Sequence, residues 1–266
     1  MPETSKVRVI ARQKATQIMI ANGKGGVGKT TVTTNLVSHL SLLGPVAMLD
    51  LDPQASASFW LQLRGPREPK ISALSTKLYD RGQVTRSWMT HKVGQQVRYV
   101  VCDTPAGIHS PDLDRWLLDT DILLIPVAPS QIDINATAAF VKQLLLNPQY
   151  RAKPVALGVI MNRVKRNTLS FQKLERFLDS LKIPVVATLR DTQNYVKAVE
   201  AGLGINELPK PSAVDRDDWL KVIRWIRKAE QQQSTALERR QARRTLEQGA
   251  SQLLGTEVCQ DVSGEE

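Results

Sequence analysis

Residues 21–31 have the side chains and the spacing of a phosphate-binding loop. They read Ala-Asn-Gly-Lys-Gly-Gly-Val-Gly-Lys-Thr-Thr and lie between an apolar run, residues 18–20, and an amphipathic pattern that begins at Val32. Glycines let successive backbone N–H groups surround a phosphate, because a residue without a Cβ takes positive φ at little cost. A lysine reaches the β- and γ-phosphate oxygens and a hydroxyl holds Mg²⁺. A plain strand-to-helix turn is the alternative, and the complete pattern argues against it. The predicted nucleotide-binding residues here are Gly23, Lys24, Gly25, Gly26, Val27, Gly28, Lys29, Thr30 and Thr31.

Carboxylates that follow two other apolar runs could complete a phosphoryl-transfer site. Asp103 follows the apolar residues 99–102, and Asp50 and Asp52 lie in Asp-Leu-Asp-Pro-Gln after residues 46–49. Phosphoryl transfer requires a bound Mg²⁺, cations on the developing charge and a group that places the attacking water. Carboxylate and hydroxyl oxygens suit Mg²⁺. The predicted metal-binding residues are therefore Thr30, Asp50 and Asp103. The alternatives are a carboxylate that caps the next segment for Asp103 and a turn-forming Asp-Pro for Asp52.

The elements that must position these groups alternate between apolar strands and amphipathic helices. Near-continuous apolar strands of this kind form a parallel sheet that helices cover on both faces. The predicted fold class is α/β, a doubly wound, mostly parallel sheet with its ligand at the carboxyl ends of the strands. The predicted strands are residues 18–20, 46–49, 97–102, 122–127, 155–161 and 185–188, and the predicted helices begin near Val32, Ser130, Leu169 and Asp218.

The chain length bounds the number of domains. With 266 residues the chain can bury one substantial core. We expect a basic lead-in at 1–14, an ATPase domain at 15–230 and a polar C-terminal tail at 231–266 that is partly helical or disordered. Residues 55–95 are less periodic and predict moderate helix content, with core contacts at Trp60, Leu61, Leu74, Leu78 and Trp88.

The composition restricts the partners and the cellular location. A net charge of +10 and a pI near 9.7 favour an acidic polymer or surface as a partner, and leave nucleic acid and anionic membrane both open. Cys102 and Cys259 are too few for a disulfide framework or a four-cysteine metal site. No apolar run approaches the roughly 18 residues of a membrane-spanning helix, so we expect a cytoplasmic protein.

Lys24 follows the first glycine of the loop and adds a second cation to it. The stretch Lys-Gly-Gly-Val-Gly-Lys-Thr-Thr resembles the deviant Walker A motif of the ParA/MinD family. Asp-Leu-Asp-Pro-Gln resembles the switch I motif of ParA proteins. The resemblance continues through 103–107, 129–133 and 189–202 and covers about residues 15 to 228. It implies that Lys24 crosses a dimer interface to the partner's nucleotide and that Asp52 organises the hydrolytic water. The catalytic residues implied are Lys24, Lys29 and Asp52.

The resemblance also bears on the choice of nucleotide. Asn162 corresponds to the family's base-proximal position, and Pro209 is expected to flank the adenine. A guanine-recognition motif of the Asn-Lys-x-Asp type would require an acidic residue at position 165, where this chain has Lys165. The expected cofactors are therefore ATP and Mg²⁺.

The favoured function is that of a small ParA-type ATPase in DNA partition. Such proteins dimerise on ATP, bind DNA without sequence preference and are released when a centromere-binding adaptor of the ParB type stimulates hydrolysis, which implies a nucleoid-associated protein. The expected DNA-binding residues are Arg190, Lys197, Lys221, Arg224 and Arg227, although each alone could be a solvated helix charge. A membrane helix of the MinD kind is disfavoured because the chain ends in Gly-Glu-Glu. The alternatives are a spatial regulator that positions a non-DNA cargo and a metabolic P-loop ligase.

Overall fold

The computed structural model of this chain describes residues 15–74 and 97–257. The chain divides after Arg224 into two compact units. The first unit holds the sheet and its covering helices. The second unit, within the described residues, is the continuation of one long helix, α9 (Ala213–Glu257). The domain bounds expected from the sequence stay a prediction.

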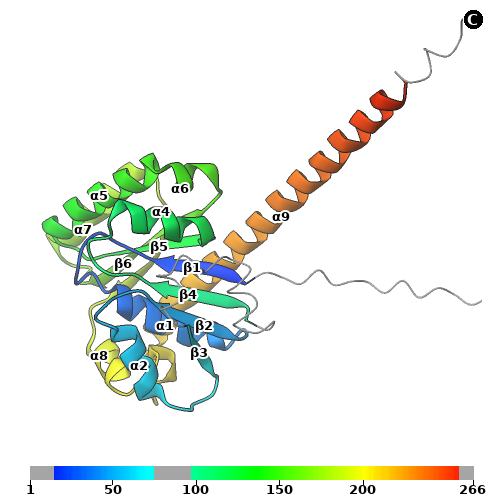
Figure 1. Cartoon of the computed structure of the whole chain (residues 1–266). Helices are drawn as coiled ribbons and strands as arrows, with labels where there is room; N and C mark the ends of the chain where they lie inside the picture. Colours follow the sequence, from blue (N-terminus) through cyan, green and yellow to red (C-terminus); the bar gives the residue numbers. More distant parts are fainter. Residues whose placement is uncertain (1–14, 75–96, 258–266) are drawn as a thin grey trace, which may run out of the picture. The chain divides into compact units, whose positions relative to one another are not determined.

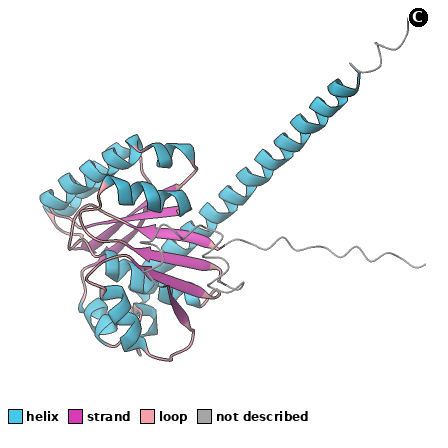
Figure 2. Ribbon diagram, in the orientation of Figure 1, coloured by secondary structure: helices cyan, strands magenta, loops and turns pink. Residues whose placement is uncertain are grey.

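The described residues of the first unit form a seven-stranded sheet in the order β3-β2-β4-β1-β5-β6-β7, and every pairing in it is parallel. Figure 2 shows the strands side by side between the helices. The predicted fold class is confirmed. The strands are β1 (Thr16–Ile20), β2 (Val46–Asp50), β3 (Ile71–Leu74), β4 (Tyr99–Asp103), β5 (Ile122–Val127), β6 (Ala156–Val164) and β7 (Val185–Arg190).

Helices cover both faces of the sheet, as Figure 1 shows. One face carries α4 (Ser110–Asp119), α5 (Gln131–Leu146), α6 (Pro148–Ala152) and α7 (Leu169–Leu181). The other face carries α1 (Lys29–Ser41), α2 (Ser56–Arg64), α8 (Gln193–Glu200) and the short 3₁₀ helix η2 (Ile205–Glu207). No helix in the described ranges combines the length and the apolar character that crossing a bilayer would require.

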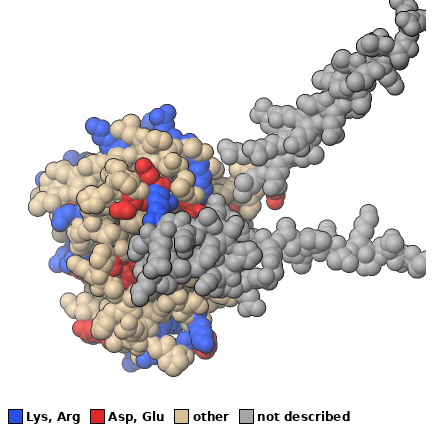
Figure 3. Space-filling view, viewed as in Figure 1, with Lys and Arg blue, Asp and Glu red and all other residues tan. Residues whose placement is uncertain are grey.

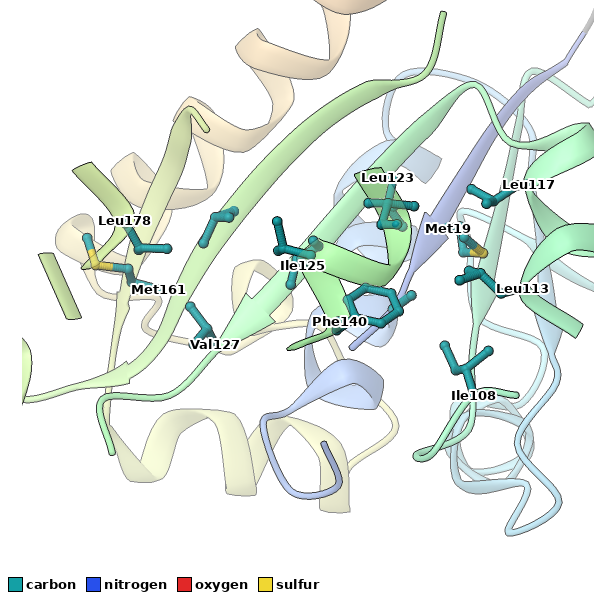
Figure 4. Close-up of a cluster of buried hydrophobic side chains, with 14 of the residues drawn as sticks. Met19, Ile108, Leu113, Leu117, Leu123, Ile125, Val127, Phe140, Met161 and Leu178 are labelled. Atoms are coloured by element: carbon teal, nitrogen blue, oxygen red, sulfur yellow. The ribbon is translucent and has the colours of Figure 1, made fainter. Parts of the chain in front are cut away.

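A large apolar cluster lies between the sheet and helices α4, α5 and α7 (Figure 4). Met19, Leu123 and Phe140 are at most 3% exposed within it. Burial of one such side chain contributes about 1.5–3 kcal/mol. This packing holds the helices against the sheet whose strands carry the loops of the site at their carboxyl ends.

The local sequence signals located several elements closely. Residues 122–127 form a strand and α7 begins at Leu169, as predicted. Ser130 caps α5, and its side chain accepts a hydrogen bond from the backbone N–H of Asp133.

Other elements differ from the expectation or lie outside the described residues. Helices α4 and α8 were not predicted, because both are short. The less periodic region contains α2 and β3, with Trp60 buried and Leu61 half-buried. The predicted lead-in at 1–14 and the predicted core contacts Leu78 and Trp88 lie outside the described residues.

Candidate nucleotide site

The strand order brings the sequence-predicted residues to one edge of the sheet. Strand β4 pairs with both β1 and β2, and Asp103 stands opposite Ile20 on one side and Asp50 on the other. Parallel strands end at the same edge. The loop after β1 therefore lies beside the carboxylates that end β4 and β2.

The loop after β1 presents backbone N–H groups to an anion. Gly26 and Gly28 have φ of +79° and +90°, the left-handed region that glycine adopts without strain. Gly28 also precedes α1, whose first turn contains no acidic side chain. The free N–H groups and the dipole of that helix end favour a phosphate.

Lys29 is buried beneath this loop. Its Nζ donates a hydrogen bond to the carbonyl of Lys24 at 3.1 Å. Burial lowers the pKa of Lys29, Asp103 and Asp52 oppose that change, and the positive charge of Lys24 lowers the pKa further. A bound polyphosphate would pair its negative charge with the buried Lys29 ammonium and so oppose the lowering of the Lys29 pKa by burial.

Asp103 combines with hydroxyls of α1 into a set of oxygen donors. It is fully buried and accepts hydrogen bonds from Thr30 Oγ1 at 2.7 Å and Thr33 Oγ1 at 3.0 Å. Burial raises the pKa of Asp103 to about 7, against the two threonine hydrogen bonds. A carboxylate and a hydroxyl suit a hard cation such as Mg²⁺, which would supply the missing positive charge. The residues present therefore fit Mg²⁺, with Thr30 and Asp103 as its holders.

Asp50 and Asp52 have different surroundings. Asp50 is buried, and its oxygens accept hydrogen bonds from the backbone N–H of Ser58 at 2.7 Å and of Asp52 at 3.2 Å. It thereby fixes the start of α2 to the end of β2. Asp52 is half-buried and accepts a hydrogen bond from the Gln54 N–H at 2.9 Å. Asp52 lines the cavity, which suits a group that places water.

A cavity of about 930 Å³ opens above these residues. This volume lies in the range of ligand pockets. The loop after β1, the Asp52–Gln54 turn, the end of β6 and the segment from Arg190 to Glu200 line it. The site can accommodate a nucleotide with its metal.

The two residues predicted to lie near the base, Asn162 and Pro209, differ in the structure: only Asn162 lines the cavity. Asn162 is buried and lines the cavity, and its Nδ2 donates to the Val27 carbonyl at 2.9 Å. An added Cβ at Gly28 would lie 2.1 Å from that Nδ2, so Asn162 and the loop are in close contact. Pro209 is exposed and is not among the residues that line the cavity.

Two of the predicted DNA-binding residues, Arg190 and Lys221, are paired with acids. Arg190 lines the cavity and makes a two-bond ion pair with the buried Asp215, at 2.6 and 2.8 Å. Lys221 pairs with Asp218 at 2.7 Å. Lys197 and Arg224 are exposed, and Arg227 belongs to the second unit.

The sequence did not indicate several residues that the structure places at the site. Thr33 carried a usable signal, because it lies three residues after Thr30 and so faces the same side of α1. Arg163 and Tyr195 also line the cavity. They come from a strand end and a short helix, and nothing in their local sequence marks them.

Comparisons with known proteins agree with this geometry. The family model for the CobQ/CobB/MinD/ParA nucleotide binding domain matches residues 18–205. Maintenance of carboxysome distribution protein A from Halothiobacillus neapolitanus is 28% identical over 205 residues, 75% of this chain and 90% of that protein. The protein of the same name from Gloeobacter kilaueensis is 30% identical over 208 residues, 77% of this chain and 86% of that protein. The chromosome-partitioning ATPase Soj from Thermus thermophilus is 49% identical over 57 residues, 21% of this chain and 23% of that protein.

Solved structures share the fold. A McdA–ATP complex from Cyanothece has a TM-score of 0.62 at 18% identity and covers 81% of this chain and 96% of that one. A plasmid partition protein from Borrelia burgdorferi bound to AMPPNP has a TM-score of 0.63 at 16% identity, covering 81% and 100%. MinD from Pyrococcus horikoshii with Mg-ADP has a TM-score of 0.57 at 19% identity, covering 78% and 93%. The predicted cofactors, ATP and Mg²⁺, are thereby confirmed at the level of the family.

Proposed function

Because the chain belongs to the CobQ/CobB/MinD/ParA nucleotide-binding family, we propose that it is an ATPase that dimerises on ATP and positions a cargo other than DNA. The resemblance to the ParA/MinD family is confirmed by the same match. The observation that carries the proposal is the similarity to two carboxysome distribution proteins over about three quarters of the chain. It favours the spatial regulator over DNA partition, which the sequence alone had favoured. No relative named above supports a metabolic ligase.

The proposed chemistry uses the groups that face the cavity. The N–H groups of the loop and Lys29 hold the phosphates, and Asp52 orients the attacking water. Bound Mg²⁺ would supply positive charge to the phosphate oxygens. Asp103 and Thr30 hold that ion, and Asp50 keeps the Asp52 turn in place through its hydrogen bonds to Asp52 and Ser58. Lys24 reaches the nucleotide of a partner subunit.

The proposed partners are a second copy of the chain, a stimulating adaptor and DNA bound without sequence preference as a track on the nucleoid. Figure 3 shows Lys and Arg on the visible face with Asp and Glu among them. On the first turns of α9, the cations Arg216, Lys221 and Arg224 lie among the acids Asp217 and Asp218, while Asp215 pairs with Arg190. DNA contact through this part of α9 is therefore proposed to be weak. Because each phosphate contact contributes a log–log slope of about −0.9, its salt dependence measures how many contacts are made.

Plasmid or chromosome partition is the second candidate. The short match to Soj favours it, because its identity is higher than that of the longer matches. The two candidates share the nucleotide chemistry and differ in the cargo.

Deletion of the gene in its own host separates the two candidates. Electron cryotomography would measure the spacing of large protein assemblies, and replicon loss would be counted in the same cells. We expect clustered assemblies with normal replicon inheritance, and the Asp52→Ala allele should reproduce this defect. Replicon loss with evenly spaced assemblies would overturn the proposal in favour of partition.

A further inference from the structure

Strand β6 contains an irregularity where it reaches the cavity. Its pairing with β7 shifts register between Met161 and Val164. Within this bulge Arg163 has a φ of +54°, a left-handed conformation that costs a non-glycine residue roughly 1–2 kcal/mol. Strained residues of this kind concentrate at functional sites.

In the bulge, the side chains of three consecutive residues have different surroundings. Asn162 is buried and binds the Val27 carbonyl, and Val164 is buried in the core. Arg163 between them is exposed and lines the cavity. The bulge therefore presents an arginine to the cavity at the point where the loop after β1 is anchored.

The charge of Arg163 has no partner among the described residues. The nearby acid Asp191 pairs with Lys165 at 3.6 Å, and the next arginine along the cavity wall, Arg190, pairs with Asp215. A strained and unpaired cation that lines a ligand cavity indicates a contact with the ligand.

The strand order identifies which part of a nucleotide lies near Arg163. The loop after β1 takes the phosphates, and the γ-phosphate side faces Asp103 and Asp52, on the β4 and β2 side of β1. Arg163 lies next to the last residue of β6, on the opposite side of β1. A nucleotide whose phosphates lie in the loop would therefore extend its nucleoside toward Arg163.

We propose that Arg163 positions the nucleoside, with its planar guanidinium against the face of the base. Guanidinium groups stack on aromatic rings and gain strength from the π-electrons of the ring. This inference rests on the proposed function in requiring that the chain bind a nucleotide.

Two substitutions remove the guanidinium without disturbing the backbone. Arg163→Gly relieves the left-handed strain, and Arg163→Asn places there a residue that tolerates this conformation. Arg166→Asn is the matched control, because Arg166 is exposed in the loop that follows β6 and does not line the cavity. A Tm at or above that of the wild type in Arg163→Gly shows that the fold is intact.

The probes are ADP, which carries a base and is not hydrolysed, and pyrophosphate, which carries none. Calorimetry should show ADP binding weakened about tenfold in both Arg163 variants, within the range of a cation–π contact, while pyrophosphate binding and the Arg166→Asn control stay unchanged. Equal weakening of both probes would assign Arg163 to the phosphates and overturn the proposal, as would unchanged ADP binding. If the wild type binds neither probe, the proposed function fails together with this inference, whereas a failure of the inference alone leaves wild-type ADP binding intact.

Discussion

At the scale of single residues, we propose that Lys29 serves nucleotide binding and that Asp52 serves hydrolysis. Lys29 is buried under the phosphate loop, while Asp52 also lines the cavity and accepts a hydrogen bond from the Gln54 N–H of its own turn. We expect Asp52→Ala to retain ATP affinity and lose hydrolysis, and Lys29→Ala to weaken ATP binding itself. Calorimetric ATP affinity and phosphate release, measured on both variants, check this division. Near-normal turnover in Asp52→Ala would remove Asp52 from the mechanism.

His39 couples stability to pH from inside α1. Its ring stacks on Trp219 with centroids 4.9 Å apart, and its Nδ1–H donates to the Asn35 carbonyl at 2.8 Å. Burial lowers the pKa of His39 to about 4 from 6.5, although the Asn35 hydrogen bond and Glu207 act in the opposite direction. In the unfolded chain His39 is therefore protonated below about pH 6.5, whereas in the folded protein it is protonated only below about pH 4. Stability is unaffected above this window and falls as the pH drops through it.

The prediction is a loss of about 2 kcal/mol of unfolding free energy between pH 7 and pH 5 from this group alone. His39→Phe keeps a ring against Trp219 and cannot take up the proton, so this part of the pH dependence should disappear. Urea denaturation at both pH values measures it. His109→Asn changes an exposed histidine and should keep the wild-type pH dependence. An unaltered pH dependence in His39→Phe would show that another group is responsible.

At the scale of elements, side chains of α2 bind the segment that follows α8. Arg64 makes a two-bond ion pair with Glu207 of η2, at 2.6 and 2.7 Å. Trp60 Nε1 donates to the Leu203 carbonyl at 3.1 Å. Because Asp50 fixes the start of α2, the Asp52 turn is held between β2 and this attachment. A displacement of the Asp52 turn would therefore require α2 and η2 to move with it.

Gly202 permits this attachment through close backbone contact. It has a φ of +65°, and an added Cβ would lie 2.4 Å from the Arg64 nitrogen. Gly202→Ala should therefore cost about 3 kcal/mol of unfolding free energy. Gly107 has the same φ of +65° with no atom within 4 Å of an added Cβ, so Gly107→Ala should cost only about 1 kcal/mol. Equal losses in urea denaturation would show that backbone conformation, and not the contact with α2, decides the effect.

The elements also show how far local sequence carries structural prediction. Strand β5 and helix α7 were located closely because a continuous apolar run and a strong helical period depend only on neighbouring residues. The phosphate loop was located for the same reason. The position of Arg163 depends on a bulge against β7, and the pairing of Arg190 depends on Asp215, which lies in another element. Contacts of this kind leave no local pattern, so neither could be predicted.

At the scale of the whole molecule, the proposed function depends on whether Lys24 joins two copies. The main chain of Lys24 is fixed, since its N–H donates to Asn22 Oδ1 and its carbonyl accepts from Lys29, both at 3.1 Å. Among the described residues its side chain has no assigned hydrogen bond or ion pair. In the proposed chemistry Lys29 holds the phosphates of its own subunit, so a second cation is most useful at a neighbour's nucleotide. There it would offset phosphate charge across an interface from which water is excluded, where such pairing is strongest.

Lys24→Ala should therefore bind ATP as a monomer and fail to dimerise. Sedimentation with ATP in an Asp52→Ala background, where turnover is prevented, measures this directly. Lys70→Ala is the matched control, because Lys70 is an exposed lysine outside the cavity lining, and it should dimerise like the parent. A Lys24→Ala dimer as stable as that control would refute the cross-subunit role and leave Lys24 a surface lysine. Loss of the dimer with unchanged ATP affinity would instead establish that ATP joins two copies through this residue, as the proposed positioning cycle requires.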